Sequence, residues 1–455
     1  MTYAIQNSCM IHTLRNRTMS FFRPLLRSAF VRDIATMQVG RMVLIGCSFL
    51  SSIIYARFLG LGGYGHYAVV LAFTGVFGLL TNLGQQATTL TFFAEAYGRK
   101  DRTALAQILQ YYIVLSACTA GLLLLFAVLA PLVTDRIYGN PEIGHLARIV
   151  FLSSICELIF IYYSIALQTV RKIRLLTLLE NAKTVLQVGL ATLFLVRGFG
   201  VAGILWSWII ASASFSALSC FLYPSLRAEY NLPHMYEALR EGNASTLWKH
   251  TKDGLWIAAD KSLGNLYPNI FLFALSTQVQ ESVVGSLRLA FKLGGLPASF
   301  GLASVGRLAS SVLPTFAGKG HTALRTGLRK LTTHTLAMHG LITLCGLLII
   351  PPLLPVVYGK SFGIAVYPFL VIAVLNVLLA FHAVTTPILR IYSKISVAAV
   401  LNAVGTVVAL GLFFGLETVL KPTFALYIAL LVYHGIIALV FPTALKLIHR
   451  APPTA

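Results

Sequence analysis

Seven basic residues fall inside or at the ends of stretches that are otherwise apolar enough to cross a lipid bilayer. A charge at the centre of the hydrocarbon costs about 2.5–3.5 kcal/mol, so such residues usually face a polar interior or an opposite charge. Only three acidic residues, Glu157, Glu180 and Asp260, share these stretches. This excess of positive charge predicts an interior that receives an anion. The seven basic residues are Arg41, Arg148, Lys183, Lys261, Arg288, Lys292 and Arg307.

Four of these residues form the predicted anion site. Arg288 and Lys292 are four residues apart, so they share one face of a helix and can grip a phosphate or pyrophosphate. Lys261 and Arg41 occupy equivalent positions in two halves of the chain, and we assign both to the same cavity. The alternative for Arg288 and Arg41 is that each extends to the nearby membrane interface.

The remaining charged residues suggest structural or coupling roles. Glu180 and Lys183 lie one helical turn apart, which favours an ion pair between them. Glu157 lies in the preceding span and can join both in an internal network; it is also a candidate for proton coupling, with a neutral, hydrogen-bonded acid as the alternative. Asp260 can join such a network through a neighbouring helix. Arg148 and Arg307 lie at span ends, where we expect interfacial anchoring.

These residues must be positioned by membrane-spanning helices. The chain has 455 residues, of which 57% are hydrophobic and 11% charged, with a mean hydropathy of +0.80. Soluble domains carry about 25% charged residues, so an all-α polytopic membrane protein is predicted. Windows of about 20 apolar residues give twelve expected spans: 36–58, 64–84, 109–131, 146–168, 176–197, 200–223, 254–275, 283–307, 332–357, 364–389, 395–416 and 422–445.

The net charge of +21 follows the topology of these spans. Most Lys and Arg residues lie in the two tails and in the loops after even-numbered spans. The opposite loops and span ends hold only five: Arg57, Arg136, Arg197, Lys360 and Lys421. Because positive residues concentrate on the cytoplasmic side, both termini are predicted to be cytoplasmic. The lipid bilayer, and not nucleic acid, is the expected partner of this charge.

The two halves of the chain resemble each other at an offset near 220 residues. Gly65 matches Gly285, and Tyr138-Gly139 matches Tyr358-Gly359. Six spans per half give parallel repeats, which predicts two pseudo-symmetric six-helix lobes around a central cavity. The expected organisation is a basic tail (1–35), a first lobe (36–223), a cytoplasmic linker (224–253), a second lobe (254–446) and a short cytoplasmic tail (447–455).

Several function classes lack support in the sequence. No Gly-rich nucleotide loop of the Walker type occurs, and the loops on the outer side are too short for a catalytic domain. The six cysteines show no metal-binding or disulfide spacing. We therefore expect no enzyme, no catalytic residue, no cofactor and no metal. Transport must then be driven by an ion gradient, the membrane potential or the substrate gradient.

Short motifs resemble those of polysaccharide-biosynthesis flippases, the O-antigen-type branch of the multidrug/oligosaccharidyl-lipid/polysaccharide exporter superfamily. The motifs are Arg57–Ala68, Asn82-Leu-Gly, Glu281–Leu293, Leu313-Pro314 and Val357–Phe362. The resemblance implies a transporter that moves an undecaprenyl-diphosphate-linked oligosaccharide across the bacterial inner membrane. It also implies partners among the glycosyltransferases and polymerase of the same pathway.

Two alternatives remain open. The first is a cation-coupled multidrug antiporter of the same superfamily, although such exporters favour acidic binding residues and the first span here contains Arg41 and no carboxylate. The second is a membrane enzyme acting on lipid-linked sugars. Such enzymes generally need a large outer loop or a pair of catalytic carboxylates, and the sequence shows neither.

Overall fold

The computed structural model describes residues 29–81, 85–240, 267–300, 302–317, 320–392, 394 and 396–450. All the regular elements in these ranges are helices. Asp260 and Lys261, together with residues 241–253 of the predicted linker, lie outside them.

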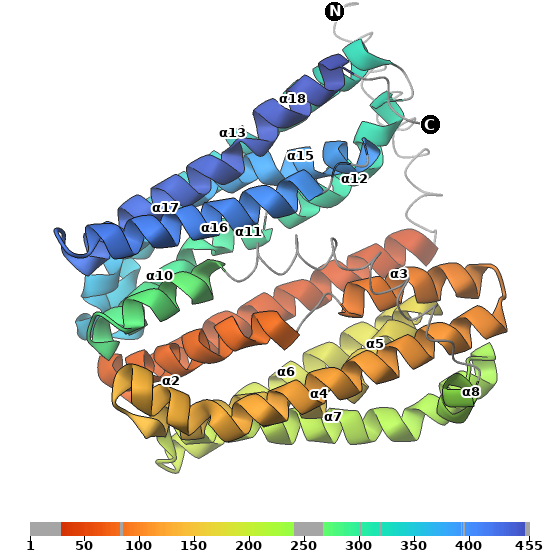
Figure 1. Cartoon of the computed structure of the whole chain (residues 1–455), viewed down its shortest axis with the longest axis horizontal. Coiled ribbons are helices and arrows are strands. Elements are labelled where there is room, and N and C mark those ends of the chain that lie inside the picture. Colours follow the sequence, from red (N-terminus) through yellow and green to blue (C-terminus); the bar gives the residue numbers. More distant parts are fainter. Residues whose placement is uncertain are drawn as a thin grey trace, which may run out of the picture.

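The first lobe begins with a long helical hairpin. Helix α2 is interrupted at Gly60, where a φ of 65° leaves the helical region, and its two halves then run side by side (Figure 1). Tyr55 and Tyr67 from the two halves are in edge-to-face contact, with ring centroids 5.8 Å apart. The lobe consists of α2 (Ala29–Thr81), α3 (Gln85–Gly98), α4 (Arg102–Tyr138), α5 (Pro141–Thr169), α6 (Ile173–Val196), α7 (Gly200–Tyr230) and α8 (Met235–Arg240).

The second lobe has shorter and more interrupted helices. Its first described helix is Tyr267–Ser276. The others are α10 (Glu281–Gly294), α11 (Leu296–Phe300), α12 (Leu302–Ala317), α13 (His321–Tyr358), η1 (Lys360–Ala365), α14 (Val366–Leu375), η2 (Asn376–Leu378), α15 (Leu379–Ile391), α16 (Ser396–Leu416), α17 (Pro422–Ala438) and α18 (Val440–Arg450).

The predicted fold class is confirmed, with a difference in the eighth span. Among the described residues, nine helices are long and apolar enough to cross a membrane, and one of these, Gln38–Gly78, holds two spans because of the turn at Gly60. The eighth span was expected as one helix over 283–307, but it is divided into α10, α11 and α12. Gly294-Gly295 ends α10, and Pro297 lacks the N–H that would continue it.

The sharp turn between α4 and α5 follows from its sequence. Gly139 ends α4 in the left-handed conformation, with a φ of 63°. Asn140 then caps α5 by accepting a hydrogen bond from the backbone N–H of Glu142 at 2.9 Å, and Pro141 occupies the first turn. Its repeat mate, Tyr358-Gly359, ends α13.

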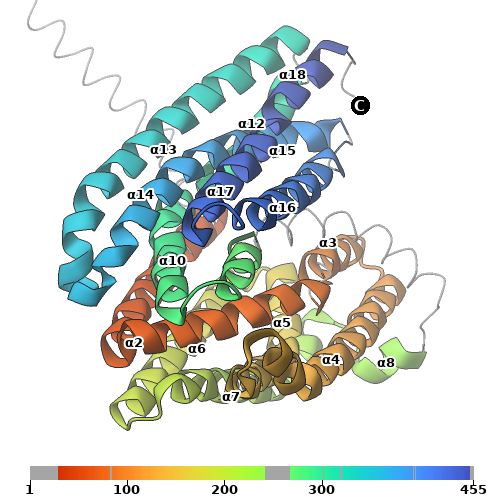
Figure 2. The same cartoon turned by 60° about the vertical axis from the view of Figure 1, so that its left-hand side comes forward.

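The lobes meet at one end of the molecule and diverge at the other. Figures 1 and 2 show two bundles whose ribbons separate toward the end where α2 begins and α18 ends. We call this the termini end, and we call the opposite contact between the lobes the seam. At the seam, a Cβ atom on Gly65 would lie 2.0 Å from the carbonyl oxygen of Glu281, and one on Gly285 would lie 2.8 Å from the Gly65 Cα. Two repeat-related glycines therefore allow backbone to approach backbone.

Further seam contacts are also related by the repeat. Tyr358 of the second lobe hydrogen-bonds Ser52 of the first at 3.0 Å, and Tyr138 of the first lobe hydrogen-bonds Ser276 of the second at 2.8 Å. His66 Nδ1 and the Glu281 carboxylate add a hydrogen bond across the seam at 2.8 Å. The phenylalanines one turn before these serines contact the same tyrosine rings edge-on: Phe49 with Tyr358 at 6.3 Å, and Phe273 with Tyr138 at 6.4 Å.

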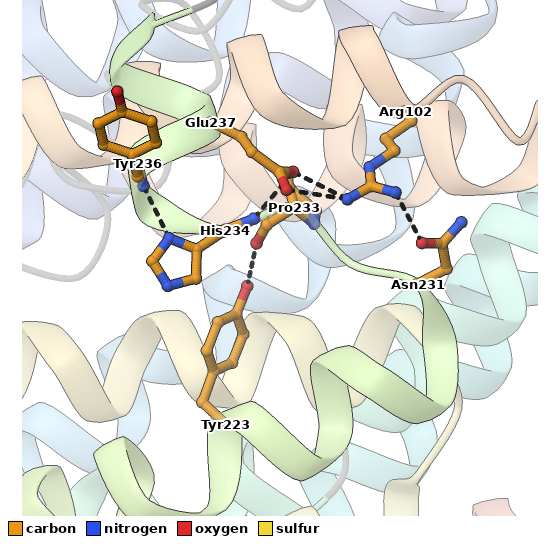
Figure 3. Close-up of polar contacts among 7 residues, drawn as sticks. All are labelled: Arg102, Tyr223, Asn231, Pro233, His234, Tyr236 and Glu237. Atoms are coloured by element: carbon orange, nitrogen blue, oxygen red, sulfur yellow. Dashed lines mark hydrogen bonds and ion pairs between the residues drawn. The ribbon is translucent and has the colours of Figure 1, made fainter.

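The start of the linker is attached to the first lobe. Although the linker was expected from residue 224, α7 continues through Pro224 to Tyr230. Arg102 at the start of α4 then binds Asn231 at 3.0 Å and both carboxylate oxygens of Glu237 at 2.9 and 3.0 Å (Figure 3). The Tyr223 hydroxyl donates to the carbonyl of Pro233 at 2.9 Å. The segment through Arg240 therefore packs as part of the first lobe.

Candidate functional site

A cavity of about 510 Å³ lies between the lobes, next to the seam. We call it the interlobe cavity. Its basic residues are Arg288 and Lys292, and its described lining contains no Asp or Glu. The predicted pair thus faces one space, as the four-residue spacing required. The lining comprises Ser48, Ser51, Ser52, Tyr55, Tyr64, Tyr67, Thr184, Gln187, Val188, Trp208, Pro268, Asn269, Leu272, Arg288, Phe291 and Lys292.

Both basic side chains bond to neutral acceptors. The Arg288 guanidinium donates from Nη1 to the side-chain oxygen of Asn269 at 3.1 Å. Lys292 donates from Nζ to the backbone carbonyl of Ser48 at 2.6 Å, across to the first lobe. A carbonyl or amide orients a cation without cancelling its charge. Since no acidic residue of the described lining compensates these two positive charges, an anion would be stabilised beside them.

The rest of the interlobe cavity is aromatic and uncharged. Tyr67 lies at the centre of a group of rings, with centroids 5.8 Å from Tyr55, 5.9 Å from Tyr64 and 6.5 Å from Trp208. Tyr64 and Tyr67 are nearly fully buried in the wall beside the seam. Serine hydroxyls and the Gln187 amide supply hydrogen-bonding groups between these rings. This combination of apolar surface and a few polar groups is typical of ligand pockets.

Arg41 lies in a neighbouring space. It lines a pocket of about 340 Å³, the flank pocket, whose other charged residue is Lys292. Ser48 and Lys292 belong to both spaces, so the flank pocket adjoins the interlobe cavity. The structure therefore brings Arg41 near Lys292 but does not place it beside Arg288. The pocket is otherwise mostly apolar, with Leu44, Ile45, Ser48, Phe49, Leu293, Leu296 and Ser299.

A second large cavity lies within the first lobe. This first-lobe cavity measures about 520 Å³ and contains Glu157, Glu180 and Lys183. Lys183 forms an ion pair with Glu157 of α5, whereas its predicted partner was Glu180. Lys183 on α6 therefore contacts an acid on the neighbouring helix and not the acid one turn away on its own helix. Among the described residues, Glu180 has no ion-pair partner and no hydrogen bond to its carboxylate.

The two large cavities adjoin. Thr184, Gln187 and Trp208 line both of them. Gln187, Thr184 and Glu180 are spaced three or four residues apart on α6, so they share one face of that helix. A continuous polar surface of α6 therefore leads from the cationic interlobe cavity to the acidic first-lobe cavity.

Arg148 hydrogen-bonds the backbone of α4 beside a proline, a role that we did not predict from the sequence. Pro131 inside α4 has no N–H, so it leaves the carbonyl of Ala127, four residues earlier, without its helical donor. Arg148 of α5 donates from Nε to this carbonyl at 2.8 Å and from Nη2 to that of Val128 at 3.3 Å. The residue thus satisfies the Ala127 carbonyl, which Pro131 leaves without a donor inside an apolar helix.

Three predicted charged residues keep only their sequence assignments. Asp260 and Lys261 lie outside the described residues, and although Arg307 belongs to α12, its side chain is not described. The repeat register is also relevant to Lys261. The pairs Ser52/Ser276 and Phe49/Phe273 correspond at an offset of 224, four residues more than the 220 that matched Arg41 to Lys261. The equivalence of Arg41 and Lys261 therefore stays a prediction.

Sequence reasoning missed the neutral part of the site. Asn269, Gln187 and Trp208 line the cavities. An uncharged residue in an apolar span costs much less free energy than a charged one, so its type alone does not indicate a site. One signal was available for Gln187. It follows Glu180, Lys183 and Thr184 on the same face of a helix, and this polar face has no place against lipid.

Comparisons with known proteins agree with this architecture. The family model described as "Polysaccharide biosynthesis protein" matches residues 30–318. Among curated proteins, no match is found.

Solved structures share the fold across nearly the whole chain. An inward-facing multidrug resistance MATE family transporter of the MOP superfamily aligns with a TM-score of 0.68 and 16% identity, covering 90% of this chain and 98% of that one. An outward-facing structure of a transporter with the same description gives 0.63 and 18%, with 93% and 97% covered. The eukaryotic MATE transporter AtDTX14 gives 0.62 and 15%, with 92% and 97% covered. These likenesses confirm the two-lobed, twelve-helix fold.

Proposed function

Since the chain belongs to the polysaccharide biosynthesis protein family, we propose that it translocates an undecaprenyl-diphosphate-linked oligosaccharide across the bacterial cytoplasmic membrane for surface polysaccharide assembly. The observation that carries this proposal is the interlobe cavity, where Arg288 and Lys292 face an aromatic space whose described lining has no carboxylate. A multi-pass protein with such an interior is suited to an anionic substrate.

The chemistry of the cavity matches a diphosphate. Arg288 can form parallel hydrogen bonds to two phosphate oxygens, and Lys292 supplies a point charge one helical turn away. The flank pocket beside Lys292 is lined by Leu44, Leu293 and Leu296, which suit an apolar prenyl chain that remains near the lipid. Lys292 would then bind at the junction between the diphosphate head and the lipid tail.

The divergence of the lobes supports an inward-open state. The positive-inside bias of the loops supports a cytoplasmic location for both termini, and with them for the open termini end. The glycan-diphosphate head would enter there, the lobes would close around it, and the seam contacts would break to open the opposite side. Neutralisation of the diphosphate by Arg288 and Lys292 would lower the cost of that passage. The driving gradient would be of ions, potential or substrate.

Charge reversal tests the proposal. Lys292→Glu and Arg288→Glu should each reduce glycan export at least tenfold at matched protein levels, since a carboxylate would repel the diphosphate. Arg329→Glu is the matched control, because Arg329 is exposed on α13 outside the cavities. Full export by both cavity variants would refute the cationic-cavity proposal. Copurification with glycosyltransferases or polymerase would test the proposed pathway partners.

The antiporter alternative has one observation in its favour. Glu157 and Glu180 line the first-lobe cavity, and carboxylates there can bind a cationic drug or a coupling proton. An efflux assay separates the two functions. Extrusion of organic cations that is blocked by Glu157→Gln, with glycan export unaffected by Lys292→Glu, would favour the antiporter.

A further inference from the structure

We propose that the first-lobe cavity binds the glycan end of the substrate and selects uncharged or amino sugars over acidic ones. This inference rests on the proposed function, because it takes the diphosphate to be held at Arg288 and Lys292. It assigns Gln187 and Trp208 to sugar contact and Glu180 to the rejection of carboxylate-bearing sugars.

The position of the cavity supports this role. A diphosphate between Arg288 and Lys292 lies in a cavity that shares Thr184, Gln187 and Trp208 with the first-lobe cavity. The sugar joined to the diphosphate must extend away from the lipid tail, and the flank pocket that suits the tail borders Lys292. From Gln187 to Glu180 the surface of α6 extends about 10 Å, at 1.5 Å per residue. The glycan therefore has a direct path into the first lobe.

The residues at this boundary suit a sugar ring. Sugars combine an apolar face of C–H groups with a rim of hydroxyls. Trp208 offers a flat apolar surface, and the half-buried Gln187 can both donate and accept hydrogen bonds. The hydroxyl of Ser164 donates to the Phe160 carbonyl at 2.8 Å, and its oxygen can still accept a hydrogen bond from a ligand. These groups bind neutral sugars without requiring an opposite charge.

The charges of the first-lobe cavity determine which sugars fit. Lys183 is paired with Glu157, so its charge is already compensated. Glu180 lines the same cavity and, among the described residues, has no ion-pair partner within 4 Å. The described lining of this cavity therefore carries one excess negative charge, while that of the interlobe cavity carries two positive ones. A uronic acid beside Glu180 would meet like charge in a partly desolvated space, whereas an amino sugar would be attracted.

Binding to the purified protein in lipid nanodiscs tests this selectivity. The probes are polyprenyl diphosphate without a sugar and its N-acetylglucosaminyl, aminoglucosyl and glucuronosyl derivatives. We expect the N-acetylglucosaminyl probe to bind about tenfold more tightly than bare polyprenyl diphosphate, and the glucuronosyl probe to lose that gain. Trp208→Ala and Gln187→Ala should abolish the gain, measured in each variant as the ratio of its affinities for the N-acetylglucosaminyl probe and for bare polyprenyl diphosphate, because both residues also line the interlobe cavity. Detectable binding of bare polyprenyl diphosphate by each variant also shows that it is folded.

Glu180→Gln tests the electrostatic contribution of Glu180 to this selectivity. It should bring the affinity for the glucuronosyl probe to within about twofold of that for the N-acetylglucosaminyl probe and weaken the aminoglucosyl probe. Glu142→Gln makes the same change at an exposed site in the first turn of α5 and should alter neither.

The outcomes separate the two proposals. If bare polyprenyl diphosphate binds independently of Arg288 and Lys292, the proposed function fails. The glycan subsite is refuted, and the proposed function stands, if that binding requires both residues but a sugar adds no affinity. The same holds if the added affinity of the N-acetylglucosaminyl probe survives Trp208→Ala and Gln187→Ala. Unchanged rejection of the glucuronosyl probe by Glu180→Gln would likewise overturn the role of Glu180.

Discussion

The first lobe arranges its polar interior around open space, whereas the second lobe holds its polar interior in direct contact. In the first, Glu180 and the Glu157–Lys183 pair line a cavity of about 520 Å³. In the second, the Asn376 side-chain oxygen accepts a hydrogen bond from Tyr267 at 3.0 Å and lies 3.3 Å from His434 Nε2, and its amide donates to the carbonyl of Gly294 at 2.9 Å. Asn376 and His434 are 2% and 1% exposed.

This difference shows how two repeats of one topology can have different structural roles. Polar groups sealed from water must find partners within the protein, and once paired they fix the helices that carry them. Gly294 is the last residue of α10, so the Asn376 network holds the end of the helix that presents Arg288 and Lys292. The second lobe thus supplies rigid support for the cationic residues, and the first lobe supplies space for a ligand.

Removal of one amide from each lobe tests this comparison most severely. Asn376→Leu leaves the Tyr267 hydroxyl and the Gly294 carbonyl without partners and should destabilise the protein by about 3 kcal/mol. Gln187→Leu is the matched change at a cavity wall and should cost less than about 1 kcal/mol, because open space remains for water. Thermal unfolding in detergent measures both. Equal losses would mean that the two interiors are equally well packed.

A larger side chain at the seam tests whether the lobes move as separate bodies. Gly65→Ala puts a Cβ atom 2.0 Å from the Glu281 carbonyl, so the seam must open by more than 1 Å. The strain should be about 2 kcal/mol and should favour the state in which the seam is open. Spin-label distances between the lobes near the seam should lengthen.

Gly62→Ala is the control for this substitution, because nothing lies within 4 Å of its Cβ position. If Gly65→Ala lowers thermal stability without changing the interlobe distances, the lobes are not independent bodies at this contact.

The smallest effect concerns the attachment of the linker to the first lobe. The Arg102 guanidinium and the His234 N–H lower the pKa of the Glu237 carboxyl. The attachment is therefore strongest above the ordinary carboxyl pKa of about 4.3, and it weakens as the pH falls through the lowered value. The protection of residues 231–240 against hydrogen exchange, corrected for the intrinsic pH dependence of exchange, should fall on acidification. In Glu237→Gln this protection should start lower and vary little with pH, and a variant as pH-sensitive as the wild type would contradict the assignment.

The parts of the fold and site that could be predicted from the sequence are those that depend on patterns within one helix. Apolar windows located the spans, and helical spacing placed Arg288 and Lys292 at one cavity. The partner of Lys183 was wrong because a long side chain has several candidates, and packing of α5 against α6 selected Glu157. Neutral residues such as Asn376 gave no signal, since a buried amide is identified only by what surrounds it.

The seam also sets a mechanical scale for the molecule. From Gly60 back to Ala29, the first half of α2 extends roughly 45 Å at 1.5 Å per residue. If a lobe rotates about the seam as a rigid arm of this length, each degree moves its far end by about 0.8 Å. A rotation of roughly 10° would change the width of the termini end by about 8 Å. The helices need not bend for the termini end to widen or narrow by this amount, because rotation of a rigid arm is sufficient.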